Sequence, residues 1–379
     1  MARINVMSPW LGDEEVAAVT DVIQSGWVAQ GPRVAEFERQ FALAVDAEFA
    51  IATSNCTTAL HLALVVAGVG AGDDVVVPSF SFIATANAPT YVGARPVFTD
   101  IDPTTGNVTA ETIGRAITAK TRAVIVVDQG GVPVDLEPIL ALCEPLGITV
   151  IEDAACGAGS TYRGGPVGSR AALTAWSFHP RKLLTTGEGG MLTTGNADWA
   201  ARARRLREHS MSVSATDRHG SVLPPAEDYS EVGFNYRMTD LQAAIGIVQL
   251  GRLPAIVERR RELAANYALS LGDLASLRVV SDPSWGTCNF QSLWIEILPG
   301  AASDREGVLE ALANADISAR RGIMAAHRQQ AFAHRDTGDQ ALPMTERLTD
   351  STLILPLYHG LSAPDQERVV TAVRAAVGG

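Results

Sequence analysis

The sequence is poor in lysine and in cysteine, and it has no long apolar run. Of its 30 Lys and Arg residues, only Lys120 and Lys182 are lysines. Its four cysteines lie far apart without a CxxC pair, which indicates neither a zinc cluster nor a disulfide framework, so we expect no metal. There is no run of about 18 apolar residues and no apolar signal core near residue 1. We therefore expect a protein of the reducing cytoplasm.

Positive charge is also scarce. The formal net charge is −12 and the pI is about 5.1, whereas phosphate backbones are held by net basic surfaces. The one basic run, ARARRLREH at 201–209, is typical of a solvated helix face. We therefore expect neither nucleic-acid binding nor membrane binding.

The remaining composition is that of an α/β protein. Short β-branched runs alternate with helical patterns from about residue 50 to 195, which predicts a mostly parallel sheet flanked by helices. Polar residues or Gly and Pro follow each run, where a loop would cross the carboxyl edge of the sheet. Open α/β sheets bind ligands at that edge. The candidate strands are 73–80, 94–101, 122–128, 148–154 and 173–178.

Helical patterning predicts helices over 57–68, 198–209 and 240–271. Proline has no backbone N–H and clashes with the preceding turn, so Pro254 should kink or break the last of these. We place a domain boundary there. The prediction is a large domain over 1–250, including the N-terminal segment, and a smaller α+β domain over 251–379.

Lys182 lies in the stretch WSFHPRKLLTTGEGG at 176–190, between an arginine and two leucines. A guanidinium stays protonated in proteins, whereas an amine can attack a carbonyl or act as a base once burial or a neighbouring positive charge lowers its pKa. In a chain that uses Arg almost everywhere, this position favours chemistry that needs an amine. A surface lysine is the alternative interpretation.

Two other stretches carry candidate site residues. In TSNCTTALHLAL (53–64), cap-type residues precede an apolar helix, so backbone N–H groups and the helix dipole converge where a phosphate could bind. An ordinary capped helix is the alternative. In VIEDAACGAGS (150–160), Glu152 and Asp153 end a strand, and strand alternation sends their side chains to opposite faces. Only one should meet a ligand, although such an Asp can also cap the following turn.

The order of these features points to one cofactor. A phosphate site, an aromatic-bearing loop in PSFSFIATANA (78–88), a strand-end carboxylate and an amine on a Gly-rich turn follow one another along the chain. Pyridoxal 5′-phosphate (PLP) needs an anion site, a surface to stack on, a counter-charge for its ring nitrogen and an amine for its aldehyde. We therefore predict a PLP site.

With these motifs the chain resembles the DegT/DnrJ/EryC1/StrS (sugar) aminotransferases, a family of fold-type I PLP-dependent enzymes. The resemblance implies a large domain with a mostly parallel seven-stranded sheet, a smaller α+β C-terminal domain and a homodimer. The stretches that carry it are SGWVAQGPRVAEFERQFA (25–42), NCTTALHLAL, VPSFSFIATANA, VIEDAA, SFHPRKLLTTGEGGM, NYRMTDLQAAIGIVQL and LPLYHGL (355–361).

The resemblance also implies roles for single residues. Lys182 would form the Schiff base, Asp153 would pair with the pyridinium nitrogen, and Phe82 would stack on the ring. Asn235, in GFNYRMTD, would reach the phosphate of the neighbouring subunit's cofactor, so that a dimer completes the site. The residues expected at the phosphate within one chain are Thr57, Thr58 and Ser177.

Three further positions either have two interpretations or depart from the family pattern. His327 lies in the family's substrate-facing loop, where a surface position is equally consistent with the sequence. Cys156 stands where many members have Gln or His beside the ring. Asp128 replaces a common His at the end of its strand, which could alter substrate choice or cofactor electronics.

The implied activity is transfer of an amino group from glutamate or glutamine to a keto group of a nucleotide-linked sugar or related acceptor in sugar or secondary-metabolite biosynthesis. The alternatives are a PLP-dependent sugar dehydratase and a PLP-binding regulator without turnover. Relatives that dehydrate sugars generally replace the lysine by His or add an iron–sulfur cluster, and this chain keeps Lys182. The candidate residues for binding the diphosphate of an acceptor are Arg33, Arg320 and Arg321.

Overall fold

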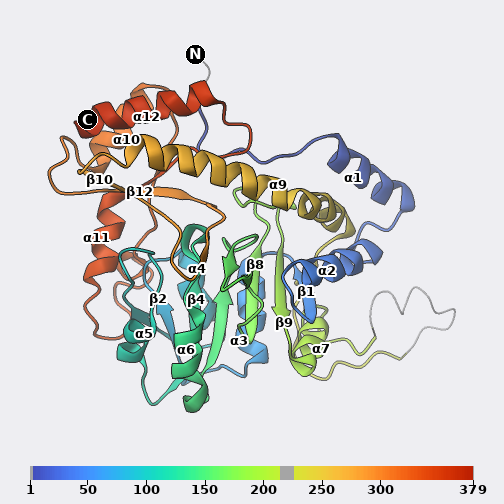
Figure 1. The fold of residues 1–379 in the computed structure, drawn as a ribbon. Coiled ribbons are helices and arrows are strands. Elements are labelled where there is room, and N and C mark those ends of the chain that lie inside the picture. Colours follow the sequence, from blue (N-terminus) through green and yellow to red (C-terminus); the bar gives the residue numbers. More distant parts are fainter. Residues whose placement is uncertain (1–2, 214–225, 379) are drawn as a thin grey trace.

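The computed structural model of the chain describes residues 3–213 and 226–378. Its centre is a seven-stranded sheet in the order β1-β9-β8-β5-β4-β2-β3 (Figure 1). All of these strands run in one direction except β9, which is antiparallel to both of its neighbours. The predicted mostly parallel α/β sheet is confirmed. The strands are β1 (Phe49–Thr53), β2 (Asp74–Pro78), β3 (Arg95–Thr99), β4 (Thr121–Val127), β5 (Thr149–Asp153), β8 (Leu173–Ser177) and β9 (Gly190–Thr194).

Each of the five strands predicted from the apolar runs exists, within three residues of the expected bounds. These runs are rich in β-branched residues because strands of a parallel sheet are buried on both faces. Val75, Val76 and Val77 of β2, for example, are all fully buried. The strands β1 (FAIAT) and β9 (GMLTT) were not predicted, because Ala, Gly and Thr dilute the apolar signal in both.

Helices cover both faces of this sheet. One face packs against α2, α5, α6 and the first half of the long helix α9, and the other packs against α3, α4 and α7. The carboxyl edge of the sheet therefore lies between two helical layers. The bounds are α1 (Asp13–Ser25), α2 (Pro32–Ala44), α3 (Cys56–Val66), α4 (Ile83–Tyr91), α5 (Ala110–Ala116), α6 (Leu136–Cys143), α7 (Ala197–Leu206) and α9 (Asp240–Leu271).

A second core lies beside the large sheet and forms the upper part of the molecule in Figure 1. Its antiparallel sheet has the order β10-β12-β14-β13, and the N-terminal segment joins it through a bridge between Ile4 and Ile317. The elements are β10 (Leu277–Val279), β12 (Leu293–Ile297), β13 (Arg320–Arg321), β14 (Thr352–Leu355), α10 (Arg305–Asn314), α11 (Pro343–Ser351) and α12 (Ala363–Val377).

Shorter elements complete the described chain. A small sheet has the order β11-β6-β7, and three 3₁₀ turns lie in loops. Their bounds are β6 (Thr161–Tyr162), β7 (Gly165–Pro166), β11 (Gly286–Thr287), η1 (Gln129–Gly131), η2 (Glu144–Leu146) and η3 (Ala326–Arg328).

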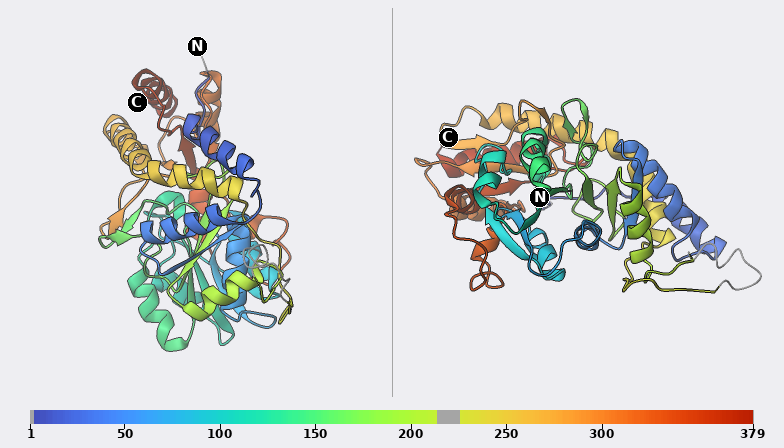
Figure 2. Two further views of the ribbon diagram at one scale, coloured as in Figure 1. Left: turned by 90° about the vertical axis from the view of Figure 1, so that its right-hand side faces the viewer. Right: turned by 90° about the horizontal axis from the view of Figure 1, so that it is seen from below.

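Pro254 does not break α9. The helix is continuous from Asp240 to Leu271, and its axis changes direction along its length (Figure 2). Ile256 still packs in the large core, whereas Leu263 already packs in the second core. One helix therefore passes through both cores, and the division of the chain into residues 1–250 and 251–379 stays a prediction.

The basic run at 201–209 is only partly a solvated helix face. Arg207 is buried, donates to the carbonyl of Ala52 at 2.9 Å and pairs with Glu38. Arg202 pairs with Glu231 at 2.8 Å. These two cations hold α7 against its surroundings.

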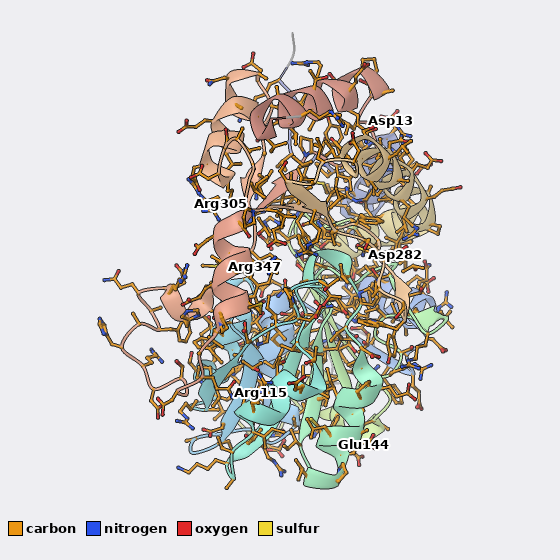
Figure 3. All side chains as sticks on the ribbon, turned by 60° about the vertical axis from the view of Figure 1, so that its left-hand side comes forward. Asp13, Arg115, Glu144, Asp282, Arg305 and Arg347 are labelled. Atoms are coloured by element: carbon orange, nitrogen blue, oxygen red, sulfur yellow. The ribbon has the colours of Figure 1, made fainter. Side chains whose placement is uncertain are left out.

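Charges of both signs are spread over the outer surface. Figure 3 marks acidic and basic side chains on several elements, among them Asp13 on α1, Arg115 on α5, Glu144 on η2, Arg305 on α10 and Arg347 on α11. Within residues 3–213 and 226–378, no helix combines the length and the apolar character needed to cross a bilayer.

Candidate active site

A cavity of about 510 Å³ lies at the carboxyl edge of the large sheet. The ends of β5 and β8, the first turn of α3 and the start of α4 form one wall, and residues of the second core form the other. Among the predicted site residues, the cavity is lined by Thr57, Phe82, Asp153, Cys156, Ser177 and Lys182. Side chains from four separate stretches of the sequence therefore meet in one place.

Lys182 lies on the turn after β8, where its backbone N–H donates to the carbonyl of His179 at 2.8 Å. Its Nζ donates to the Sγ of Cys156 at 3.1 Å. Burial by itself lowers the pKa of this amine, but Cys156, Cys56 and Asp153 offset the effect, and the net pKa is raised. A net lowering of the pKa of this amine is therefore not found.

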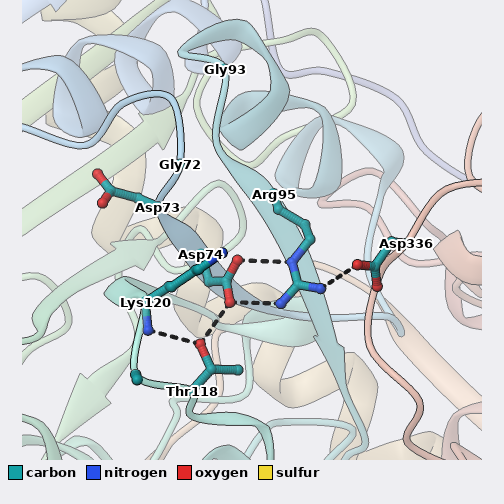
Figure 4. A pocket seen from close by; sticks show the side chains of 9 residues that line it. Gly72, Asp73, Asp74, Gly93, Arg95, Thr118, Lys120 and Asp336 are labelled. Carbon is teal, nitrogen blue, oxygen red and sulfur yellow. Dashed lines mark hydrogen bonds and ion pairs between the residues drawn. The ribbon is translucent and has the colours of Figure 1, made fainter.

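The other lysine lies at the opposite edge of the sheet, in a polar pocket of about 490 Å³ near the amino ends of β2 and β3 (Figure 4). There Asp74 accepts from Arg95 at 2.7 Å and from Thr118 at 2.6 Å, while Lys120 is exposed. Of the two lysines, only Lys182 lines the carboxyl-edge cavity.

Asp153 ends β5 and is 4% exposed. Its Oδ2 accepts from Thr85 Oγ1 at 2.8 Å and its Oδ1 accepts from Ala155 N at 3.2 Å. Burial raises its pKa, and the hydrogen bonds together with the charge of Lys182 oppose that rise. Glu152 points to the other face of the sheet, where Thr174 donates to it at 3.3 Å. The predicted opposite directions of the two carboxylates are confirmed.

The first turn of α3 is the candidate anion site. Asn55 caps the helix by accepting from Thr58 N at 2.9 Å, and the Thr58 hydroxyl returns a bond to Asn55 O at 2.7 Å. Thr57 and Ser177 turn to the cavity instead. Strand β9 approaches this turn closely, since a Cβ at Gly190 would lie 2.4 Å from the carbonyl carbon of Asn55. Backbone N–H groups and two hydroxyls therefore converge at a positive helix end.

Comparison with known proteins agrees with this geometry. The model of the DegT/DnrJ/EryC1/StrS aminotransferase family matches residues 9–374. The chain belongs to the DegT/DnrJ/EryC1/StrS aminotransferase family. It is therefore a PLP-dependent aminotransferase.

Three solved structures illustrate the similarity. The aminotransferase TlmJ from Streptoalloteichus hindustanus is 37% identical over 99% of both chains, with a TM-score of 0.91. The PLP form of the putative sugar aminotransferase Spr1654 from Streptococcus pneumoniae is 25% identical over 100% of this chain and 99% of that one, with a TM-score of 0.92. DesI, solved in the presence of its TDP-sugar product, is 29% identical over 99% of this chain and 93% of that one, with a TM-score of 0.88. Together they support a sugar aminotransferase.

The residues of this aminotransferase fit PLP in charge and shape. The first turn of α3 with Thr57 and Ser177 offers donors to a phosphate, and Asp153 offers an anion to a protonated ring nitrogen. Phe82 keeps 66% of its surface exposed while it lines the cavity, which leaves an apolar ring free for stacking. Lys182 supplies the amine.

Not every predicted residue of the aminotransferase reaches this cavity. The hydroxyl of Thr58 is used in the helix cap. His327 bonds to Ser79 at 2.7 Å and to Glu346 at 3.2 Å, which turns its ring into a separate cavity beside Phe98. Met324 and Ile323 of the same loop line the Lys182 cavity in its place. The structure thus does not bring His327 to the expected substrate-facing position.

Asn235 is exposed and lies beside Glu208, away from the cavity of its own subunit. Arg33 is exposed on α2 and does not line the cavity either, whereas Arg320 and Arg321 do. A role of Asn235 in a neighbouring subunit's site stays a prediction.

Cys156 and Asp128, the two positions that depart from the family pattern, differ in their burial and in their distance from the cavity. Cys156 lines the cavity and holds Lys182. Asp128 is fully buried beneath the loop that carries Cys156, where its Oδ1 accepts from Val134 N at 3.0 Å. A Cβ on Gly157 would lie 2.8 Å from Oδ2. Asp128 therefore does not line the cavity.

Sequence reasoning missed several residues of the aminotransferase site. Thr85 and Cys56 contact Asp153, and Gln291 and Arg260 line the cavity from the second core. An available signal was the polar Gln291 near the start of the mostly apolar run FQSLWIEIL (290–298).

Proposed function

We propose that this aminotransferase moves an amino group from glutamate or glutamine to the keto group of a nucleotide-linked sugar. One observation carries the proposal: Lys182, Asp153 and the first turn of α3 line a single cavity at the carboxyl edge of the sheet. The chemistry is the same for donor and acceptor, since the second half of a transamination reverses the first.

PLP, when bound, supplies an electron sink for the carbon that loses its proton. Asp153 would keep the ring nitrogen protonated, and its bonds from Thr85 and Ala155 hold the carboxylate in place. Lys182 Nζ would hold the aldehyde of PLP and, as a neutral amine, would be the acid–base group that carries a proton at the reacting substrate carbon. A positioned acid–base group of this kind contributes about 10²- to 10⁴-fold in rate.

The cationic side chains at the rim of the cavity favour an acceptor that carries negative charge. Arg181, Arg320 and Arg321 line the cavity, and Arg321 is paired with Glu306. Burial and the charge of Arg181 lower the pKa of Arg320, as two close cations require. A diphosphate between Arg181 and Arg320 would relieve their repulsion, and DesI was solved with a TDP-sugar product.

The homodimer belongs to this proposal. Val232, three residues before Asn235, is 87% exposed, and Val16 on α1 is 65% exposed. We propose that a partner subunit covers these two apolar side chains. The four cysteines are free, which suits the reducing cytoplasm that we propose as the location.

The test is a screen of amino donors and keto acceptors with the purified holoprotein. A first half-reaction with glutamate, followed by the loss of the cofactor's visible absorbance, separates an enzyme from a regulator that binds PLP without turnover. Formation of an amino sugar from a nucleotide-linked keto sugar supports the proposal. Loss of water from the sugar without amine incorporation would show a dehydratase instead.

A further inference from the structure

The peptide groups on both sides of Lys182 are held by one side chain from the second core. Gln291 is 8% exposed and lies just before β12. Its Oε1 accepts from the N–H of Leu183 at 2.8 Å, and its Nε2 donates to the carbonyl of Arg181 at 2.7 Å. A primary amide offers a donor and an acceptor side by side, so it matches the two peptide bonds of the lysine.

The other end of Gln291 is fixed as well. Arg260, 2% exposed in α9, donates to the carbonyls of Phe290 and Gln291 at 2.7 and 2.8 Å, and to that of Leu357 at 2.7 Å. The N–H of Gln291 donates to Asn289 Oδ1 at 2.7 Å. The amide therefore projects from a rigid base.

Asn289 makes a parallel connection to the neighbouring loop. It is fully buried, and its Nδ2 donates to the carbonyls of Cys156 and Ala158 at 2.7 and 2.8 Å. We call residues 289–291 the strap. The strap thus holds both the loop of Lys182 and the loop of Cys156, whose side chains are in contact through Nζ and Sγ.

We propose that Gln291 is a positioning residue for Lys182. A lysine side chain has four rotatable bonds, so Nζ can be aimed only if the backbone that carries it is fixed, and a displacement of about 1 Å costs up to about 10²-fold in rate. Gln291 fixes that backbone. Because the strap belongs to the second core, the position of Nζ depends on how the second core packs against the large sheet. The inference rests on the proposed role of Lys182.

The test compares three variants. Gln291→Leu removes both bonds at nearly constant volume, and Gln291→Glu keeps the acceptor for Leu183 but sets an oxygen against the Arg181 carbonyl. Gln366→Leu is the control, because Gln366 is 5% exposed in α12 and donates to the carbonyl of Leu263 at 2.7 Å, within the second core.

We expect Gln291→Leu to lower kcat of the glutamate half-reaction by about 10- to 100-fold, with little change in KM, and to slow PLP capture by the cofactor-free protein. Amide hydrogen exchange at residues 181–184 should quicken, and Gln291→Glu should fall between this variant and the wild type. Gln366→Leu should lower the unfolding temperature without any of these effects.

Unchanged capture and local exchange in both Gln291 variants would overturn the proposal, as would equal losses in Gln366→Leu. A wild-type protein that borohydride fails to link to PLP at Lys182 would instead refute the proposed function. The two failures are therefore distinguishable, and the isosteric Glu variant keeps the test open if the Leu variant does not fold.

Discussion

Asp128 and Glu152 form a buried carboxyl pair that must hold a proton. Both are at most 1% exposed. Glu152 is in register with Val126 of β4, and Asp128 lies two residues further, so both side chains share one face of the sheet. Burial and the nearby Glu152 raise the pKa of Asp128, and burial raises the pKa of Glu152 to about 7. Two adjacent carboxyl groups cannot both ionise in such surroundings.

The pair makes stability depend on pH with a defined sign. Glu152 has an ordinary pKa of 4.5 and a folded-state pKa of about 7, so the folded protein binds more protons than the unfolded chain between these values. Stability must then fall as pH rises from about 4.5 to about 7. At about 1.4 kcal/mol per pKa unit, the loss amounts to about 3 kcal/mol.

Asp128→Asn removes the need for a shared proton, because the amide is neutral at every pH and can still accept from Val134. We expect this variant to lose the part of the pH dependence that the raised pKa of Asp128 contributes and to keep the part from Glu152, whose pKa is raised by burial. It should therefore gain stability relative to the wild type at pH 8 but not at pH 5. Urea unfolding of the cofactor-free protein across this range measures both effects.

The matched control is Asp74→Asn. Asp74 is equally buried, but the hydrogen bond from Arg95 lowers its pKa, so this substitution should destabilise at neutral pH and matter less as pH falls. Stability profiles of wild type and Asp128→Asn that run parallel from pH 5 to 8 would refute the argument for a shared proton.

Three other predictions concern the cavity itself. Lys182→Arg should keep the fold and lose both the visible absorbance of the holoprotein and turnover, since a guanidinium cannot form the Schiff base; retained turnover would contradict the role. Cys156→Ala removes a group that raises the pKa of Lys182, so this variant should capture PLP faster than the wild type at pH 7, and the difference should vanish at high pH. If the variant and the wild type captured PLP at the same rate at pH 7 as well, that result would count against an effect of Cys156 on Lys182. Gly190→Ala places a Cβ against Asn55 and should weaken PLP binding at least tenfold as measured by equilibrium dialysis, whereas Gly195→Ala, where a Cβ meets nothing within 4 Å, should not.

Some features of this protein could be read from its residues alone. Parallel strands are buried on both faces, so β2, β4 and β5 appear in the sequence as β-branched runs. The scarcity of lysine singled out Lys182, and alternation along β5 separated Asp153 from Glu152. These inferences succeed because each depends on the local chain and on the period of a single element.

Other features were decided only by tertiary structure. The direction of His327 follows from its bonds to Ser79 and Glu346, which lie far away in the sequence. The pairing of Asp128 with Glu152 depends on β4 and β5 being neighbours, and the grip of Gln291 on Lys182 depends on how the second core meets the large sheet. Local periodicity contains neither the order of strands nor the contacts between cores, because both arise when distant segments pack together.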